Sequence, residues 1–125
     1  MFMTELKKTI LYDKHVKSGA TIVEFGGFAM PLYYSSIANE HNAVRNKVGM
    51  FDVSHMGEIK IEGVDAYKFI NYMVTSKITN ISKMQYALLL NDQGNVIDDL
   101  MIYPINDTSL MLVVNASNTI KDYNH

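Results

Sequence analysis

The sequence predicts an α+β fold in which an irregular N-terminal segment precedes an antiparallel sheet with helices on one face. Three observations support this prediction. Residues 58–62 alternate strictly between polar and apolar side chains, as a half-buried strand does. Residues 66–73 repeat apolar side chains at the spacing of one helical face. Three further apolar runs are separated by short segments of turn-forming residues.

Residues 1–56 are expected to be irregular for most of their length, because glycines and a proline interrupt the apolar side chains of residues 20–34. One helix is predicted near residues 37–47, because Ser35 and Ser36 can cap its start and Gly49 would end it. The Phe, Met and Ile side chains of residues 20–34 have little local structure to cover them. Exposed apolar surface is therefore expected here, and it favours self-association of the chain.

Residues 57–125 follow the order β-α-β-β-β-α, which fits a variant of the split βαβ arrangement. Asp65 can cap the first helix. A last helix begins near Ser117 and has only about two turns before His125, so we expect the chain to be the front part of a longer one. The three apolar runs are residues 85–91, 96–105 and 109–115, and the segments between them are Asn91-Asp92-Gln93-Gly94 and Asn106-Asp107-Thr108.

The composition excludes several function classes. A chain of 125 residues with 48% hydrophobic and 19% charged side chains has the composition of a folded domain rather than a disordered one. The absence of cysteine excludes disulfides, thiolate metal sites and thiol nucleophiles. The net charge of -2 and a single arginine give no basic surface for nucleic acid. Without a membrane-length apolar run or a targeting segment, we expect a cytoplasmic protein with no membrane partner.

The pair Asp98-Asp99 is the most informative feature of the sequence. Neighbouring side chains of a strand point to opposite faces, so the two carboxylates should lie on different faces of the strand over residues 96–105. Both faces are otherwise apolar, which predicts a strand that is covered on both sides. At least one carboxylate then lies in a place of low polarity, where it needs hydrogen-bond donors or takes a raised pKa. The alternative is that both carboxylates lie at a strand end in solvent.

A hypothetical strand register brings Asp99 together with other polar side chains. If the turn at residues 91–94 is symmetric, Tyr86 lies opposite Asp99; if the next loop is centred on Asn106, Val113 lies opposite Asp99 and Asn115 lies diagonal to it. A hydroxyl, a carboxylate and an amide would then converge on one patch, with Met101 beside them. Such a patch suits a flat polar heterocycle. A slip of one residue would scatter these side chains to different faces.

Other candidate sites are weaker. The histidines lack the close spacing of metal ligands, so no metal site is expected and structural or surface roles are favoured. Ser54 precedes a histidine, but no Gly-x-Ser-x-Gly surrounds it, so it is not a nucleophile elbow. Gly26-Gly27 opens no clear helix after a strand and is weak evidence for phosphate binding. The four histidines are His15, His41, His55 and His125.

A series of short motifs runs along the whole chain in an order and spacing that are together highly specific. The most characteristic is Phe51-Asp52-Val53-Ser54-His55-Met56-Gly57. Earlier motifs are Leu11-Tyr12, His15, Gly19-Ala20, Phe25, Gly27, Met30-Pro31-Leu32, Tyr34, Glu40-His41, Val44-Arg45 and Gly49-Met50. Later ones are Leu90-Asn91, Gly94, Val96-Ile97-Asp98-Asp99-Leu100 and Val113-Val114-Asn115-Ala116. In these motifs the sequence resembles the T-protein family, the aminomethyltransferases of the glycine cleavage system.

The resemblance implies a tetrahydrofolate-dependent transferase. In that family the lipoyl arm of a carrier protein, the H-protein, presents an aminomethyl group on sulfur. A folate nitrogen attacks its carbon, ammonia is released, and methylenetetrahydrofolate forms together with the dihydrolipoyl carrier. The family has a Gly-Gly pair where this chain has Gly94-Asn95, and Asn tolerates the left-handed backbone of such a turn.

The resemblance also implies roles for individual residues. The key aspartate of the family matches Asp99, which would orient the folate and stabilise positive charge at the reacting nitrogen and carbon, or accept a proton. The folate-lining positions of the family match Met56, Tyr86, Met101 and Asn115. Asp98, on the opposite face, is expected to matter less for the transfer.

Family members are much longer than this chain and have three domains around a central folate cavity. Residues 1–56 resemble the opening of their discontinuous first domain, and residues 57–125 resemble most of their second, ferredoxin-like folate-binding domain. The isolated chain is therefore expected to lack a complete active site. Two other functions remain open at this point. One is a related folate-binding protein of iron–sulfur cluster maintenance, and the other is a non-catalytic α+β interaction module.

Overall fold

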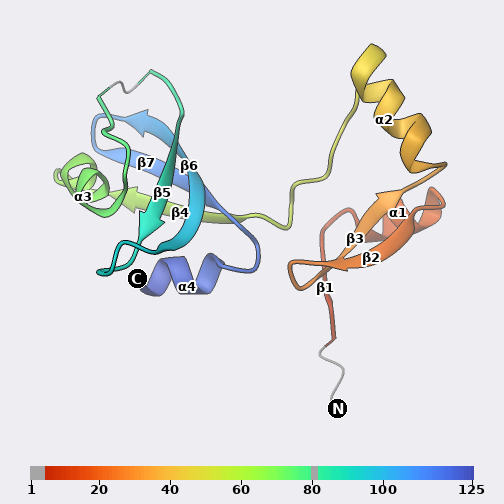
Figure 1. Cartoon of the computed structure of the whole chain (residues 1–125), viewed down its shortest axis with the longest axis horizontal. Coiled ribbons are helices and arrows are strands. Elements are labelled where there is room, and N and C mark those ends of the chain that lie inside the picture. Colours follow the sequence, from red (N-terminus) through yellow and green to blue (C-terminus); the bar gives the residue numbers. More distant parts are fainter. Residues whose placement is uncertain (1–4, 80–81) are drawn as a thin grey trace. The chain divides into compact units, whose positions relative to one another are not determined.

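The computed structural model describes residues 5–79 and 82–125, and these form two compact units, the first ending at His55 and the second beginning at Met56 (Figure 1). The first unit contains a small sheet and two helices. The second unit contains a larger sheet and two helices. No helix within the described residues has the length and apolar character needed to cross a bilayer.

The first unit is more regular than the sequence predicted. Its three-stranded sheet has the order β1-β3-β2, with β1 parallel and β2 antiparallel to β3. The two glycines that suggested irregularity, Gly26 and Gly27, have φ of +58° and +84° and form the two-residue turn of the β2–β3 hairpin. The elements are β1 (Lys7–Lys8), α1 (Tyr12–Lys17), β2 (Thr21–Phe25), β3 (Phe28–Tyr33) and α2 (Ile37–Asn46).

The predicted helix near residues 37–47 is confirmed as α2. Ser36 is its N-cap, and its hydroxyl accepts a hydrogen bond from the Asn39 backbone N–H at 3.2 Å. The helix ends at Asn46, before Gly49. Apolar exposure in residues 20–34 is mixed, because Phe25 and Leu32 are more than half exposed while Ala29 and Met30 are buried.

A hydrogen-bond network around Asp52 ties the end of the first unit to its beginning. The Asp52 carboxylate lies 2.8 Å from His15 Nε2 and accepts hydrogen bonds from the hydroxyl of Thr9 and from the backbone and hydroxyl of Ser54. The other ring nitrogen of His15 lies 2.7 Å from the hydroxyl of Tyr34. Burial opposes ionisation of Asp52, but these donors outweigh it and hold the pKa of its carboxyl well below the usual range. His15 therefore has a structural role.

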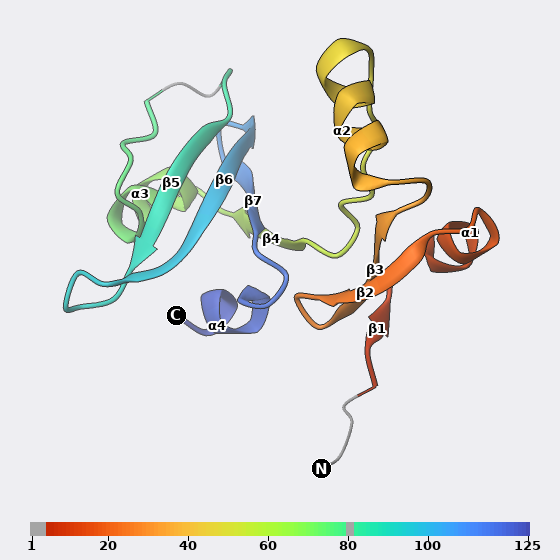
Figure 2. The same ribbon diagram turned by 45° about the vertical axis from the view of Figure 1, so that its right-hand side comes forward.

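The second unit confirms the predicted α+β order. Its four strands have the order β4-β7-β6-β5, and every neighbouring pair is antiparallel (Figures 1 and 2). The outer strands β4 and β5 thus run in opposite directions, and β5, β6 and β7 form a meander. The elements are β4 (Gly57–Glu62), α3 (Ala66–Met73), β5 (Gln85–Leu90), β6 (Val96–Asn106), β7 (Ser109–Val114) and α4 (Thr119–Asn124).

The core of the second unit lies between one face of this sheet and α3. Ile70 of α3 is 1% exposed and packs with buried side chains of β6 and β7, among them Ile102 and Leu110. Asp65 occupies the N-cap position of α3 but its side chain makes no capping hydrogen bond, unlike the prediction. The last helix, α4, approaches β4 closely at Gly57, where an added Cβ would lie only 2.6 Å from a side-chain carbon of Thr119.

The network around Asp52 predicts an acid-sensitive contribution to the stability of the first unit. Because the pKa of Asp52 is lowered on folding, its contribution is present above the unfolded-state pKa of about 4 and is lost as the pH falls below it. Asp52→Asn should therefore lower the unfolding temperature near neutral pH, and the difference from the parent should shrink as the pH falls to about 3. Thermal unfolding followed by amide NMR signals of residues 5–55 measures it. The exposed Asp13→Asn is the control, and an equal pH-dependent difference there would contradict the prediction.

Candidate active site

The face of the sheet that points away from the core is open in the described chain. The register places Tyr86, Met101 and Val113 side by side on neighbouring strands of this face. Tyr86 is 56% exposed, and Met101 and Val113 are half-buried. The prediction that the strand bearing Asp99 is covered on both sides is thus wrong for the described residues, since only the core face is covered.

A polar cluster lies on this open face. The hydroxyl of Tyr86 donates a hydrogen bond to Asp99 Oδ2 at 3.2 Å, and the side-chain amide of Asn115 donates to Asp99 Oδ1 at 2.9 Å. Desolvation, the hydrogen bond to Asp99 and the charge of Asp99 together raise the pKa of Tyr86, so its hydroxyl remains a donor near neutral pH. The predicted meeting of a hydroxyl, a carboxylate and an amide is therefore found in the structure.

The register that led to this prediction differs from the observed one. Asp99 lies opposite Leu88 rather than Tyr86, and Val113 lies opposite Met101 rather than Asp99. The turn after β5 is not symmetric, because the β5–β6 register shifts next to Leu90. Both observed registers differ from the predicted ones by two residues, and a shift of two keeps every side chain on its face.

Met56 lies immediately before β4 and is half-buried. Met56 precedes Gly57, and Asn115 follows Val114, so both residues lie next to the last printed pair of β4 and β7.

Asp98 lies on the core face and is 4% exposed, so the alternative in which both carboxylates are solvated is excluded. Its carboxylate accepts hydrogen bonds from the backbone N–H of Asn115 at 3.0 Å and from the side-chain amides of Asn115 and Asn118 at 2.8 Å each. Burial opposes ionisation, but these donors and the neighbouring carboxyl of Asp122 outweigh it and hold the pKa of Asp98 below its ordinary value. Although Asp98 faces away from Tyr86, it contacts Asn115 of the polar cluster.

Asp122 of α4 is the residue of this region that the sequence did not reveal. It is 9% exposed and contacts Asp98. Burial and the adjacent Asp98 raise the pKa of Asp122 to about 7, while the nearby charge of Lys121 acts in the opposite direction. The sequence indicates only a helix of about two turns at this position, and that pattern gives no sign that Asp122 would be buried.

The arrangement gives Asp99 a defined orientation and leaves it able to bind a ligand. Each of its carboxylate oxygens accepts one hydrogen bond from the protein and keeps a lone pair for another donor. The apolar side chains of Met101 and Val113 on the same face offer a surface for a flat ring.

Residues 11–125 match the family described as the GCVT N-terminal domain. The chain belongs to this family. It is 57% identical over 122 residues to the aminomethyltransferase of Staphylococcus haemolyticus and 58% identical over 123 residues to that of Staphylococcus epidermidis, and both matches cover 96% of this chain and 34% of the relative. The chain thus spans about a third of the length of the curated relatives that it matches.

A solved structure also matches the chain. It is the crystal structure of glycine cleavage system aminomethyltransferase T from Bartonella henselae, with a TM-score of 0.92 and 36% sequence identity. The match covers 96% of this chain and 34% of that one. The sequence resemblance to the glycine cleavage aminomethyltransferases is therefore confirmed.

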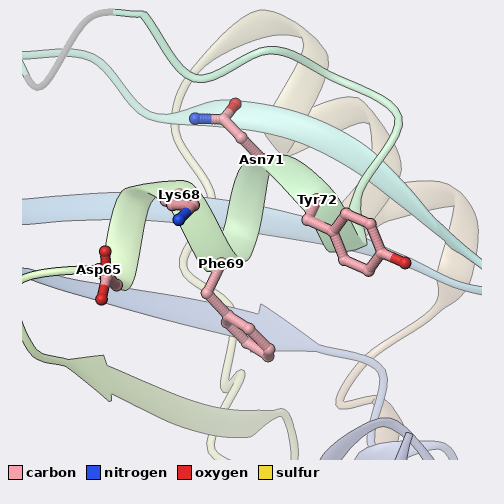
Figure 3. A pocket seen from close by; sticks show the side chains of 5 residues that line it. All are labelled: Asp65, Lys68, Phe69, Asn71 and Tyr72. Atoms are coloured by element: carbon pink, nitrogen blue, oxygen red, sulfur yellow. The ribbon is translucent and has the colours of Figure 1, made fainter.

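A hollow of about 600 Å³ lies on the outer side of α3 (Figure 3). Its side chains are arranged less favourably for binding a ligand than those around Asp99. Its side chains point in different directions, and Asn71 points away from Phe69 and Tyr72 (Figure 3). The Asn71 side chain is already used, because it accepts from the Ile78 backbone N–H at 2.6 Å and donates to the Tyr67 carbonyl. This surface therefore has no convergent polar groups like those around Asp99.

Two other types of catalytic site find no support in the described residues. Within residues 5–79 and 82–125, no group of three or more His, Asp or Glu side chains is placed to hold a metal ion. Ser54 donates its hydroxyl to Asp52 and not to a histidine, so it lacks the base that a serine nucleophile needs.

The contrast between the two aspartates predicts different effects on stability. Asp98→Asn should lower the free energy of unfolding of the second unit by about 2 kcal/mol or more, because a buried carboxylate with three N–H donors is lost. Asp99→Asn should leave it nearly unchanged, since Asp99 is exposed. Urea unfolding of both variants measures the difference. Equal destabilisation by the two substitutions would contradict the assignment of faces.

Proposed function

We propose that this chain supplies the reactive aspartate and part of the folate-binding surface of a tetrahydrofolate-dependent aminomethyltransferase of the glycine cleavage system. The proposed reaction transfers the aminomethyl carbon from the lipoyl sulfur of the carrier protein to tetrahydrofolate and releases ammonia. The observation that carries the proposal is the polar cluster of Tyr86, Asp99 and Asn115 on an open, apolar sheet face. The names of the relatives agree with this reaction.

In this proposal Asp99 is the catalytic residue. The transferred carbon exchanges its bonds to the carrier sulfur and to the amino nitrogen for bonds to two folate nitrogens, and the two N–H protons of the folate end on the thiol and on ammonia. Positive charge develops at the attacking folate nitrogen and at the transferred carbon during this exchange. A carboxylate held next to these atoms stabilises that charge without having to reorganise. Tyr86 and Asn115 fix its orientation by donating one hydrogen bond to each oxygen. A lone pair of the same carboxylate can also accept the proton that the folate nitrogen loses.

The apolar neighbours of Asp99 would bind the folate ring. Met101 and Val113 lie on the same face as the carboxylate, Met56 immediately precedes the strand β4, and long flexible methionine side chains adapt to a flat ring. Tyr86 adds an aromatic side chain that is 56% exposed. A pterin ring has both apolar faces and polar edges, so it matches a surface with one polar cluster and an apolar surround.

The remaining parts of the proposal concern the whole enzyme. Residues 57–125 would form most of the folate-binding domain, and residues 1–56 would open a discontinuous first domain. The chain matches only about a third of the length of its relatives. In this proposal the lipoyl carrier, the H-protein, binds to the whole enzyme. We propose the cytoplasm as the place of the reaction.

The role of Asp99 can be tested in a chimera in which this chain replaces the matching third of the Staphylococcus epidermidis aminomethyltransferase. Asp99→Asn should reduce aminomethyl transfer at least tenfold, which is about 1.4 kcal/mol of barrier, because the charge is lost while the shape is kept. Transfer is measured as the rate of methylenetetrahydrofolate formation.

The matched control is Asp92→Asn, which removes one exposed carboxylate from the β5–β6 turn and should leave the rate unchanged. A chimera in which Asp99→Asn is as active as the parent would contradict the proposed catalytic role.

A further inference from the structure

Asp98 and Asp122 form a pair of carboxyl groups in contact on the core side of the second unit. They come from different elements, β6 and α4, and are 4% and 9% exposed. Two buried carboxylates in contact repel each other in surroundings of low polarity, so both cannot be ionised without a large cost.

The donors around the pair are distributed unequally. Asp98 accepts three N–H hydrogen bonds, from Asn115 and Asn118. Neither side-chain oxygen of Asp122 has a hydrogen-bond donor among the described residues. A proton carried by Asp122 would supply the missing donor, because a carboxylic acid can donate to the carboxylate of Asp98. The pair then holds one proton and one negative charge.

The pair is connected to Asp99 through one side chain. The amide nitrogen of Asn115 lies 2.8 Å from Asp98 Oδ1 and 2.9 Å from Asp99 Oδ1. The backbone N–H of Asn115 also donates to Asp98, at 3.0 Å. Asp98 therefore holds both the backbone N–H and the side-chain amide of Asn115. The same amide donates to Asp99, so the position of Asn115 determines the orientation of the Asp99 carboxylate.

We propose that Asp98 and Asp122 share one proton and act as a positioning pair, which holds Asn115, and through it Asp99, in place on the open face of the sheet. The proposal of a positioning pair rests on the proposed function only in the catalytic role that it gives to Asp99. The pair itself touches no reacting atom. Its role is to keep the Asn115 amide aligned with the Asp99 carboxylate. The charge of the pair determines how strongly Asn115 is held.

The charged groups around Asp122 determine when the proton leaves. Asp98 of β6 favours its retention, and Lys121 of α4 favours its loss. The Lys121 ammonium is engaged elsewhere as well, since it donates to the Ile97 carbonyl at 2.8 Å. Gly57 of β4, which carries no charge, lies close to Thr119 of α4. Loss of the proton at higher pH leaves two adjacent negative charges, which would loosen α4 and the hold on Asn115.

An NMR titration of the isotopically labelled chain tests this proposal directly. The Asp122 carboxyl carbon should titrate with a midpoint of about 7, and the side-chain amide signals of Asn115 should move with the same midpoint. Asp122→Asn keeps the shape and supplies a permanent N–H donor to Asp98. In that variant the Asn115 signals should lose their pH dependence between about pH 5 and pH 9. Asp122→Ala, which supplies no donor, should shift the Asn115 signals at every pH.

His125→Gln is the matched control, because His125 is a neighbouring ionisable side chain whose backbone N–H donates to the Asp122 carbonyl. The titration of Asn115 should persist in that variant. An ordinary acidic midpoint for Asp122, or Asn115 signals that do not follow it, would overturn the proposal, and the parent chain alone decides this even if a variant fails to fold. The titration needs neither folate nor carrier protein, so its result is independent of the transfer assay that tests the proposed function.

Discussion

The buried carboxylate of Asp98 is the interaction on which the second unit depends. It receives N–H groups from Asn115, which follows β7, and from Asn118, which is the N-cap of α4. One side chain of β6 thus fixes the end of the neighbouring strand and the start of the last helix. A buried charge is tolerated only when its hydrogen bonds are satisfied, and here they also determine where the polar cluster of the open face lies.

The alternation of a β-strand places two adjacent aspartates in different surroundings. Asp98 points into the core side and organises it, while Asp99 points to the open face and keeps room for a ligand. Asn115 joins the two, since its amide donates to both carboxylates. The structural aspartate can therefore influence the exposed one without contacting a ligand itself.

The sequence predicted the second unit better than the first, for physical reasons. Alternation and helical spacing locate β4, α3 and the meander, because each buries one regular face. The cluster at Asp99 was predicted from a strand register that differs from the observed one by two residues. The prediction of the cluster still held, because a shift of two residues leaves each side chain on the same face of the sheet. The β2–β3 hairpin was missed because its turn glycines were interpreted as breaks, and the network of Asp52 with His15 joins residues 37 apart. The contact of Asp122 with Asp98 likewise depends on tertiary packing.

The proposed binding of folate to the open face of the sheet can be tested by a crystal structure of the chimera with tetrahydrofolate. We expect the pterin ring against Met56 and Met101, with a ring nitrogen within hydrogen-bonding distance of the Asp99 carboxylate. A structure with folate bound elsewhere, and with Asp99 in contact only with protein and water, would contradict it.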